Sequence, residues 1–152
     1  MRTIIVPAII LVLAGCGSEG DEPAGLSQLH AGELRYTATA ADGQLLLRGK
    51  LALSFPDDST VTGEWSIRWA PGADSSFQVG PQIGNGSLAG RRIGDSLVID
   101  LNPGFMDNNV ILFASSNPTN MAGRWSWSTI AGPRTGGLFW TSQDRLEIID
   151  GE

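Results

Sequence analysis

The chain has 152 residues, of which 41% are hydrophobic and 17% are charged, proportions that exclude a disordered or fibrous chain and predict one globular domain. Its formal net charge is −6, and it contains one Lys, Lys50, and one adjacent basic pair, Arg91 and Arg92. A nucleic-acid binder needs clustered cations that displace counterions. The composition therefore argues against a nucleic-acid partner.

The chain begins with an apolar run behind a cation. Arg2 precedes the apolar stretch from Ile4 to Leu13, which is shorter than the roughly 20 residues that span a bilayer but suits the core of a signal peptide. The run closes on Leu-Ala-Gly-Cys at 13–16, which resembles the bacterial lipobox. The resemblance implies that residues 1–15 are a signal peptide and that Cys16 carries diacylglycerol and a fatty acyl chain such as palmitate. The alternative is a fortuitous cysteine after an ordinary hydrophobic segment.

A lipid on Cys16 would place the protein in the bacterial cell envelope, attached to either the inner or the outer membrane. Cys16 is the only cysteine, so the exported domain can form no intramolecular disulfide and no thiolate metal cluster. The mature chain has sixteen acidic against nine basic residues, since Arg2 leaves with the signal peptide. Anionic headgroups are therefore expected to repel the domain, and attachment is expected to rest on the acyl chains.

Residues 16–32 are expected to form a lipidated, flexible tether. They are rich in glycine and acids and poor in apolar side chains, a composition typical of a linker rather than of a packed element. Residues 33–152 are expected to form one β domain with a short acidic C-terminal end.

Short alternating runs follow the tether. In 61–69 the apolar or small residues Val, Gly, Trp, Ile and Trp occupy every second position, which is the period of a half-buried strand. Asp42 and Gly43 between two such runs indicate a hairpin. The pattern predicts about eight strands, near 34–41, 44–55, 60–70, 85–92, 96–102, 109–115, 120–130 and 136–142. Their short connections favour an all-β, antiparallel up-and-down barrel, with a β-sandwich as the alternative.

Two segments repeat one pattern. VTGEWSI at 61–67 and MAGRWSW at 121–127 each place a Gly two residues before a Trp on the same strand face. We expect Gly63 and Gly123 to face the core, where a missing side chain either leaves room for an indole or allows the bend of a closing barrel.

This Gly-X-Trp unit resembles motifs of the calycin group, the lipocalins and avidin-like barrels, although a typical lipocalin carries it on the first strand. The resemblance implies a small barrel whose interior or mouth holds a small hydrophobic ligand. Trp69, Trp127 and Trp140 are the candidate ligand contacts. The alternative is that the tryptophans simply fill the core.

Catalytic residues are not expected. The single histidine, His30, falls in the tether, so a Ser-His-acid triad is not predicted. Asp57 with Asp58, and the run Asp107 to Asn109, are interpreted as turn formers rather than as a catalytic pair or a calcium loop. We therefore expect no enzyme activity, metal or cofactor.

The sequence predicts a membrane-anchored lipoprotein whose barrel binds a small apolar or amphipathic ligand. The alternative is a non-catalytic module, an inhibitor or an assembly factor, that docks to another envelope protein. Such a module would expose an apolar patch, for which the long connection Pro71 to Gly84 is a candidate because Phe77, Val79 and Ile83 lie in it. A hollow barrel interior would favour the ligand-binding hypothesis, and a filled interior would favour the hypothesis of a protein partner.

Overall fold

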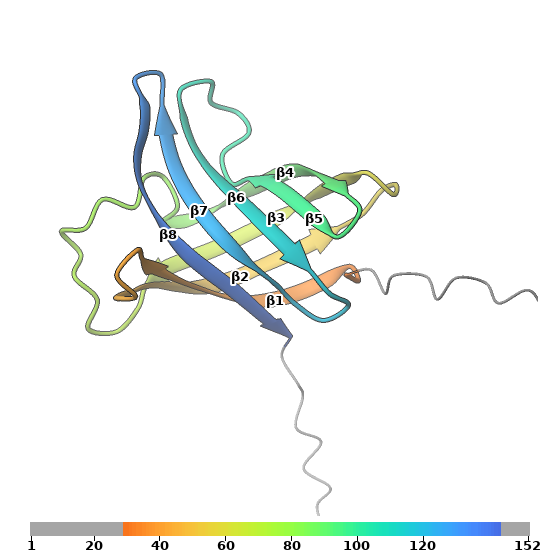
Figure 1. Ribbon diagram of the computed structural model, residues 1–152, viewed down its shortest axis with the longest axis horizontal. Coiled ribbons are helices and arrows are strands. Elements are labelled where there is room, and N and C mark those ends of the chain that lie inside the picture. The colour runs from red at the N-terminus through yellow and green to blue at the C-terminus, as the bar shows by residue number, and fades with distance from the viewer. Residues whose placement is uncertain (1–28, 144–152) are drawn as a thin grey trace, which may run out of the picture.

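The computed structural model describes residues 29–143 as an all-β domain (Figure 1). The strands are β1 (Gly32–Ala40), β2 (Leu45–Ser54), β3 (Thr60–Trp69), β4 (Gly84–Ile93), β5 (Ser96–Asp100), β6 (Asn108–Ser116), β7 (Met121–Thr129) and β8 (Gly132–Gln143). Each pairs antiparallel with the next, and β8 pairs back with β1 through a register that joins Thr37 to Trp140. The predicted eight-stranded up-and-down barrel is confirmed, and this last pairing excludes the sandwich.

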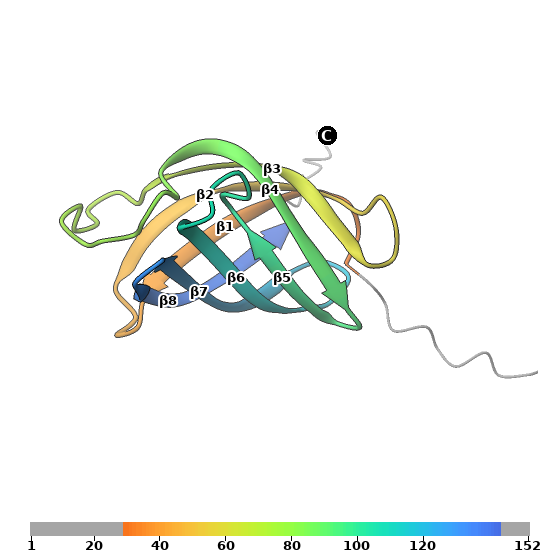
Figure 2. The ribbon, with the colours of Figure 1, turned by 90° about the horizontal axis from the view of Figure 1, so that it is seen from above.

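The alternation of side chains assigns the two faces of each strand. On β3, Val61, Trp65 and Ile67 are buried inside the barrel, whereas Glu64 and Arg68 are exposed outside it. Successive side chains of a strand point to opposite faces, so this period of two produces a closed apolar core and a polar exterior. Figure 2 shows the strands crossing obliquely around that core.

Gly63 and Gly123 face the interior as expected, but their close neighbours are backbone atoms rather than indoles. An added Cβ would collide with the carbonyl oxygen of Ala52 at Gly63 and with that of Phe113 at Gly123. Each glycine thus lets its strand bend against the preceding strand, which a small barrel needs in order to close.

The two repeated segments occupy equivalent places in the barrel. β3 and β7 are four strands apart in a closed set of eight, so they lie on opposite sides. The buried indole of Trp65 donates its Nε1–H to the carbonyl of Leu101 at 2.6 Å, and that of Trp125 donates to Thr39 at 2.8 Å. Both indoles fill the core with their single donor satisfied, which is the structural role of a buried tryptophan.

One end of the barrel is closed by residues near the N-terminus of the described chain. Leu29 is buried in the core, and its carbonyl accepts a hydrogen bond of 2.9 Å from Nη2 of Arg92. The Arg92 guanidinium lies 3.8 Å from the ring centroid of Phe55. The expected tether boundary at residue 32 is therefore wrong, because Leu29 already belongs to the core.

The opposite end is covered by the connection between β3 and β4. Val79 and Gln82 of this connection are buried. Gln82 donates to the carbonyl of Val79 at 2.7 Å and accepts from the hydroxyl of Tyr36 at 3.3 Å. Burial raises the pKa of Tyr36 far above its ordinary value, so the hydroxyl stays protonated and able to donate. The backbone carbonyl of Gln78, the residue before Val79, accepts a hydrogen bond from the hydroxyl of Thr135 on β8.

The turn between β2 and β3 yields a pH-dependent prediction. Asp57 accepts hydrogen bonds from the amide of Ser59, the hydroxyl of Ser59 and the amide of Thr60, and these donors, the Ser59 amide first, lower its pKa to about 2. Since the folded-state pKa is depressed, this contribution to stability is present above about pH 4 and is lost as the pH falls toward 2. Asp57→Asn should therefore lower the denaturation midpoint at neutral pH and flatten its acid dependence.

The control is Asp58→Asn, which removes the same charge from the next residue, where no such hydrogen bond to the carboxylate is seen. Its pH profile should follow that of the wild type. Superimposable profiles for Asp57→Asn and the wild type would contradict the assigned turn.

Candidate functional site

The predicted site residues do not converge in the structure. Cys16 lies outside the described residues. Trp69 and Trp127 face inward at the end of the barrel that the β3–β4 connection covers, and both pack half-buried against the core. Trp140 has the opposite orientation: it pairs with Thr37 and Ala122 on the outer face and is 45% exposed. The expectation that Trp140 lies at the barrel mouth is therefore wrong, because it follows the inward Phe139 by one residue.

Trp127 is already in contact with other parts of the chain. Its Nε1–H donates to Oδ1 of Asn108 at 2.7 Å, and Gly80 lies so close that an added Cβ would be 2.4 Å from the indole. A side chain at residue 80 would not fit beside the ring. The mouth position that a ligand would occupy near Trp127 thus holds the chain's own backbone.

The interior is filled by a continuous apolar cluster. The buried side chains of all eight strands join it, together with Leu29 at one end and Val79 at the other, and Phe55, Trp69, Phe77 and Trp127 pack against it. Three hollows of the surface are formed mainly by outward-facing residues. These three hollows therefore lie on the outside of the barrel.

The prediction that the β3–β4 connection exposes an apolar docking patch is also wrong. Val79 is buried and Phe77 packs against the core, so these side chains close the barrel, and only Ile83 is substantially exposed, at 42%. The reason is tertiary, because the open end of the barrel offers an apolar surface to the loop above it.

A different apolar surface lies on the outside of β5–β8, and we call it the outer apolar face. Cross-strand pairing places Val98, Phe113, Arg124 and Leu138 in one row across these four strands. Trp140 lies on the same side of β8, two residues beyond Leu138. Phe113, Leu138 and Trp140 are each about half exposed. Contiguous exposed apolar side chains of this kind mark interaction sites more often than chance exposure does.

A groove of about 480 Å³ runs along this face. Its apolar walls come from Phe113, Pro133 and Leu138, and the backbone of Gly136 and Gly137 lies between them. Two cations, Arg124 and Arg134, complete the groove, and within residues 29–143 no carboxylate forms an ion pair with either. The groove thus combines apolar contact area with two guanidinium groups that can bind carboxylates.

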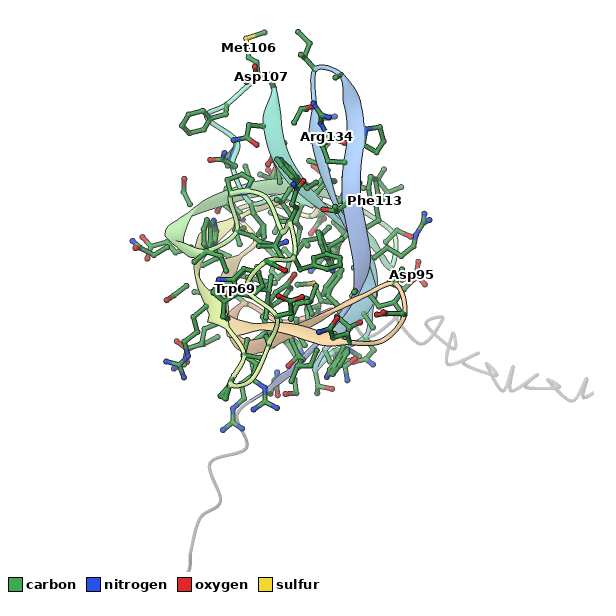
Figure 3. All side chains as sticks on the ribbon, turned by 90° about the vertical axis from the view of Figure 1, so that its left-hand side faces the viewer. Trp69, Asp95, Met106, Asp107, Phe113 and Arg134 are labelled. Carbon is green, nitrogen blue, oxygen red and sulfur yellow. The ribbon has the colours of Figure 1, made fainter. Side chains whose placement is uncertain are left out.

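Two projecting connections extend the outer apolar face. The β7–β8 turn and the β5–β6 connection rise beyond the rest of the barrel (Figure 1). They expose Ile130 at 90%, Phe105 at 59% and Met106 completely. Figure 3 shows Met106 and Arg134 on these projections, with Phe113 below them. The β5–β6 connection is held by Asn109, which donates to Asp100 at 2.6 Å, so its apolar tip is presented on a supported loop.

The described residues offer little for chemistry. Among them, no group of three or more His, Cys, Asp or Glu residues is arranged to hold a metal ion, and His30 is exposed beside the barrel end. The part of the chain that is described contains no helix long and apolar enough to cross a membrane. The outer apolar face and its groove are the candidate binding surface.

Comparison of the chain with protein-family models, with curated proteins and with solved structures finds no match. The likeness to calycin motifs stays a prediction. Except for Trp140, which was expected at the barrel mouth, the residues of the outer apolar face were missed in the sequence, because single apolar residues at outward positions, such as Phe113 and Leu138, carry no local signal. Their pairing across strands brings them together.

Proposed function

We propose that this protein is a lipid-anchored envelope lipoprotein whose barrel docks to another envelope protein through the outer apolar face. The partner segment presents apolar side chains to Phe113 and Leu138 and carboxylates to Arg124 and Arg134. The module is non-catalytic. Its lipid, attached at Cys16, holds it at the membrane where the partner lies.

The observation that carries the proposal is the filled interior beside an exposed apolar exterior. A barrel that holds a small apolar ligand needs an enclosed hollow, typically of about 300 to 1,000 Å³. Here the interior positions are occupied by side chains and the ends are covered by Leu29 and by the β3–β4 connection. Ligand binding inside the barrel stays a prediction, but packing favours the protein partner.

The chemistry of the outer apolar face supports a protein rather than a small molecule. The row crosses four strands, with apolar side chains on β5, β6 and β8 and Arg124 on β7, and exposed apolar residues also lie on the two projecting tips, so the surface extends well beyond the groove. Aromatic and arginine side chains are the residues that contribute most at protein interfaces. Phe113, Trp140 and Arg124 supply both types on one surface.

A photocrosslinking experiment tests this function. The full chain is expressed in its native cells with a photoreactive phenylalanine analogue at position 113. This analogue should crosslink to one partner protein. Leu138→Glu should weaken that product by about thirtyfold, because a hot-spot contact contributes about 2 kcal/mol. Leu138 is half exposed, so the denaturation midpoint should change little.

The control places the same analogue at Glu64, an exposed position on the outside of β3. It should give no specific product. Equal crosslinking from positions 113 and 64, or a product that Leu138→Glu does not reduce, would contradict docking through this face. Quenching of tryptophan fluorescence by palmitate in the folded wild type would instead support the interior ligand.

A further inference from the structure

A second surface, on the outside of β1–β3, gathers half of the basic residues of the described chain. We call it the basic face. It consists of Arg35 on β1, Arg48 and Lys50 on β2, and Arg68 on β3. All four are exposed, and the acids on the outward side of these three strands are Glu33 and Glu64. Lys50 and Glu33 form an ion pair of 2.6 Å.

The arrangement of these cations is unfavourable for the fold itself. Arg48 lies directly opposite Arg68 in the β2–β3 pair, and Lys50 lies directly opposite Arg35 in the β1–β2 pair. Like charges in directly opposed cross-strand positions destabilise a sheet. Lys50 already has Glu33 as its ion-pair partner, so it is the opposition of Arg48 and Arg68 that a bound anion would relieve.

The surface between them is hollowed to receive such a group. A depression of about 660 Å³ is formed by all four cations and by three hydroxyl residues, Thr37, Ser66 and Ser142. Guanidinium groups bind phosphate oxygens through paired, charge-assisted hydrogen bonds, and hydroxyls add further donors. The depression therefore suits a phosphate-bearing group in particular.

The position of the basic face on the barrel suits contact with a membrane. β2 lies four strands from β6 in the closed barrel, so the centres of the basic face and of the outer apolar face point to opposite sides, and the two faces adjoin where Ser142 of the depression follows Trp140 on β8. The chain between Cys16 and Leu29 has twelve residues, and a flexible chain of that length would extend roughly 20 Å. A lipid on Cys16 would thus hold the barrel within about its own width of the bilayer, and this chain joins the barrel at β1, one of the basic strands.

We propose that the basic face binds the anionic headgroups of the membrane. The barrel then rests on the bilayer through β1–β3 and presents its outer apolar face away from it. This inference rests on the proposed anchoring at Cys16. It revises the expectation of repulsion, because seven of the sixteen acidic residues lie outside residues 29–143, and the charge of the barrel is not uniform.

Vesicle binding tests this inference apart from lipidation. The full chain with Cys16→Ser, which cannot be acylated, should bind vesicles of phosphatidylglycerol and phosphatidylcholine in equal parts more tightly than vesicles of phosphatidylcholine alone, and added salt should weaken binding. Arg68→Gln should reduce affinity about fivefold, and Arg48→Gln with Arg68→Gln about thirtyfold. Residues 1–15 are present in every variant, so any contribution that they make to vesicle binding is the same in all variants.

Two controls keep the result specific. Arg91→Gln, an exposed change on β4 outside the basic face, should leave affinity nearly unchanged. Arg68→Lys keeps the positive charge and should retain vesicle binding. Arg68→Gln should weaken vesicle binding without lowering the denaturation midpoint, because it removes one of the two like charges that oppose each other at Arg48 and Arg68. Equal affinity for both vesicle types, equal losses for Arg68→Gln and Arg91→Gln, or equal losses for Arg68→Gln and Arg68→Lys would overturn the inference.

Failure of the anchor would look different. If the mass of the wild-type protein shows acylation at Cys16 but the Cys16→Ser chain ignores anionic lipid, the anchoring stands and the basic face does not bind headgroups. If the Cys16→Ser chain binds anionic vesicles but the wild type carries no acyl mass, the basic face binds and the anchor is wrong.

Discussion

Cys16→Ala is expected to abolish incorporation of palmitate into the protein. In the proposed modification, diacylglycerol would be joined to the cysteine sulfur through a thioether and a fatty acyl group to the cysteine amine, and Cys16 is the only cysteine. Wild-type protein should begin at residue 16 and carry the mass of a diacylglycerol and a fatty acid, whereas the variant should carry neither. Metabolic labelling with palmitate and intact-mass spectrometry measure both.

Ser18→Ala, a change just beyond the Leu-Ala-Gly-Cys motif, serves as the control and should keep both the label and the mass. Palmitate labelling and mass report acylation alone, so headgroup binding by the basic face cannot mask the result. Wild-type protein that begins at Met1 and lacks acyl mass would show that the anchor assignment is wrong.

Gly123→Val is expected to lower the unfolding free energy by about 3 kcal/mol, the upper end of the range for an overpacked core. A Cβ at residue 123 would collide with the carbonyl oxygen of Phe113 and would lie 2.9 Å from the Cα of Ala114. These are backbone atoms of β6, which cannot move aside as a flexible side chain can. For a domain of this size the melting temperature should fall by roughly 10 °C.

The matched control is Gly104→Val in the β5–β6 connection. An added Cβ there meets no atom within 4 Å, so the same chemical change should have little effect. Thermal denaturation of the two variants beside the wild type makes the comparison. Equal thermal denaturation midpoints for Gly123→Val and the wild type would contradict the proposal that this glycine lets β7 bend against β6.

The strands were predictable because a half-buried strand leaves a period of two in the sequence. The predicted segment 60–70 corresponds to β3, Thr60–Trp69, and 96–102 to β5, Ser96–Asp100. The glycine of each repeated segment was also predicted to face the core. The sequence did not show whether the glycine makes room for an indole or for the backbone carbonyl of the neighbouring strand, because the answer depends on the spacing of the strands.

The candidate surfaces were not predictable in the same way. Phe113 and Leu138 are separated by 24 residues of sequence, with Arg124 between them, and they join one row only because β6, β7 and β8 pair in a particular register. The same holds for Arg48 and Arg68, whose opposition follows from the β2–β3 register. A linear scan for adjacent cations finds Arg91 and Arg92 instead, and Arg92 is buried at the barrel end.

The amino-acid sequence by itself determined the all-β class, the number and order of the strands, and which face of β3 and of β7 turns inward, because these follow from local alternation and turn residues. Only the tertiary structure decided that Leu29 and Val79 close the barrel ends, that Trp140 points outward, and that Phe113, Arg124 and Leu138 line one groove on the outside of the barrel. These outcomes depend on barrel closure, since the register of eight strands sets which distant side chains share a surface and how much interior space remains.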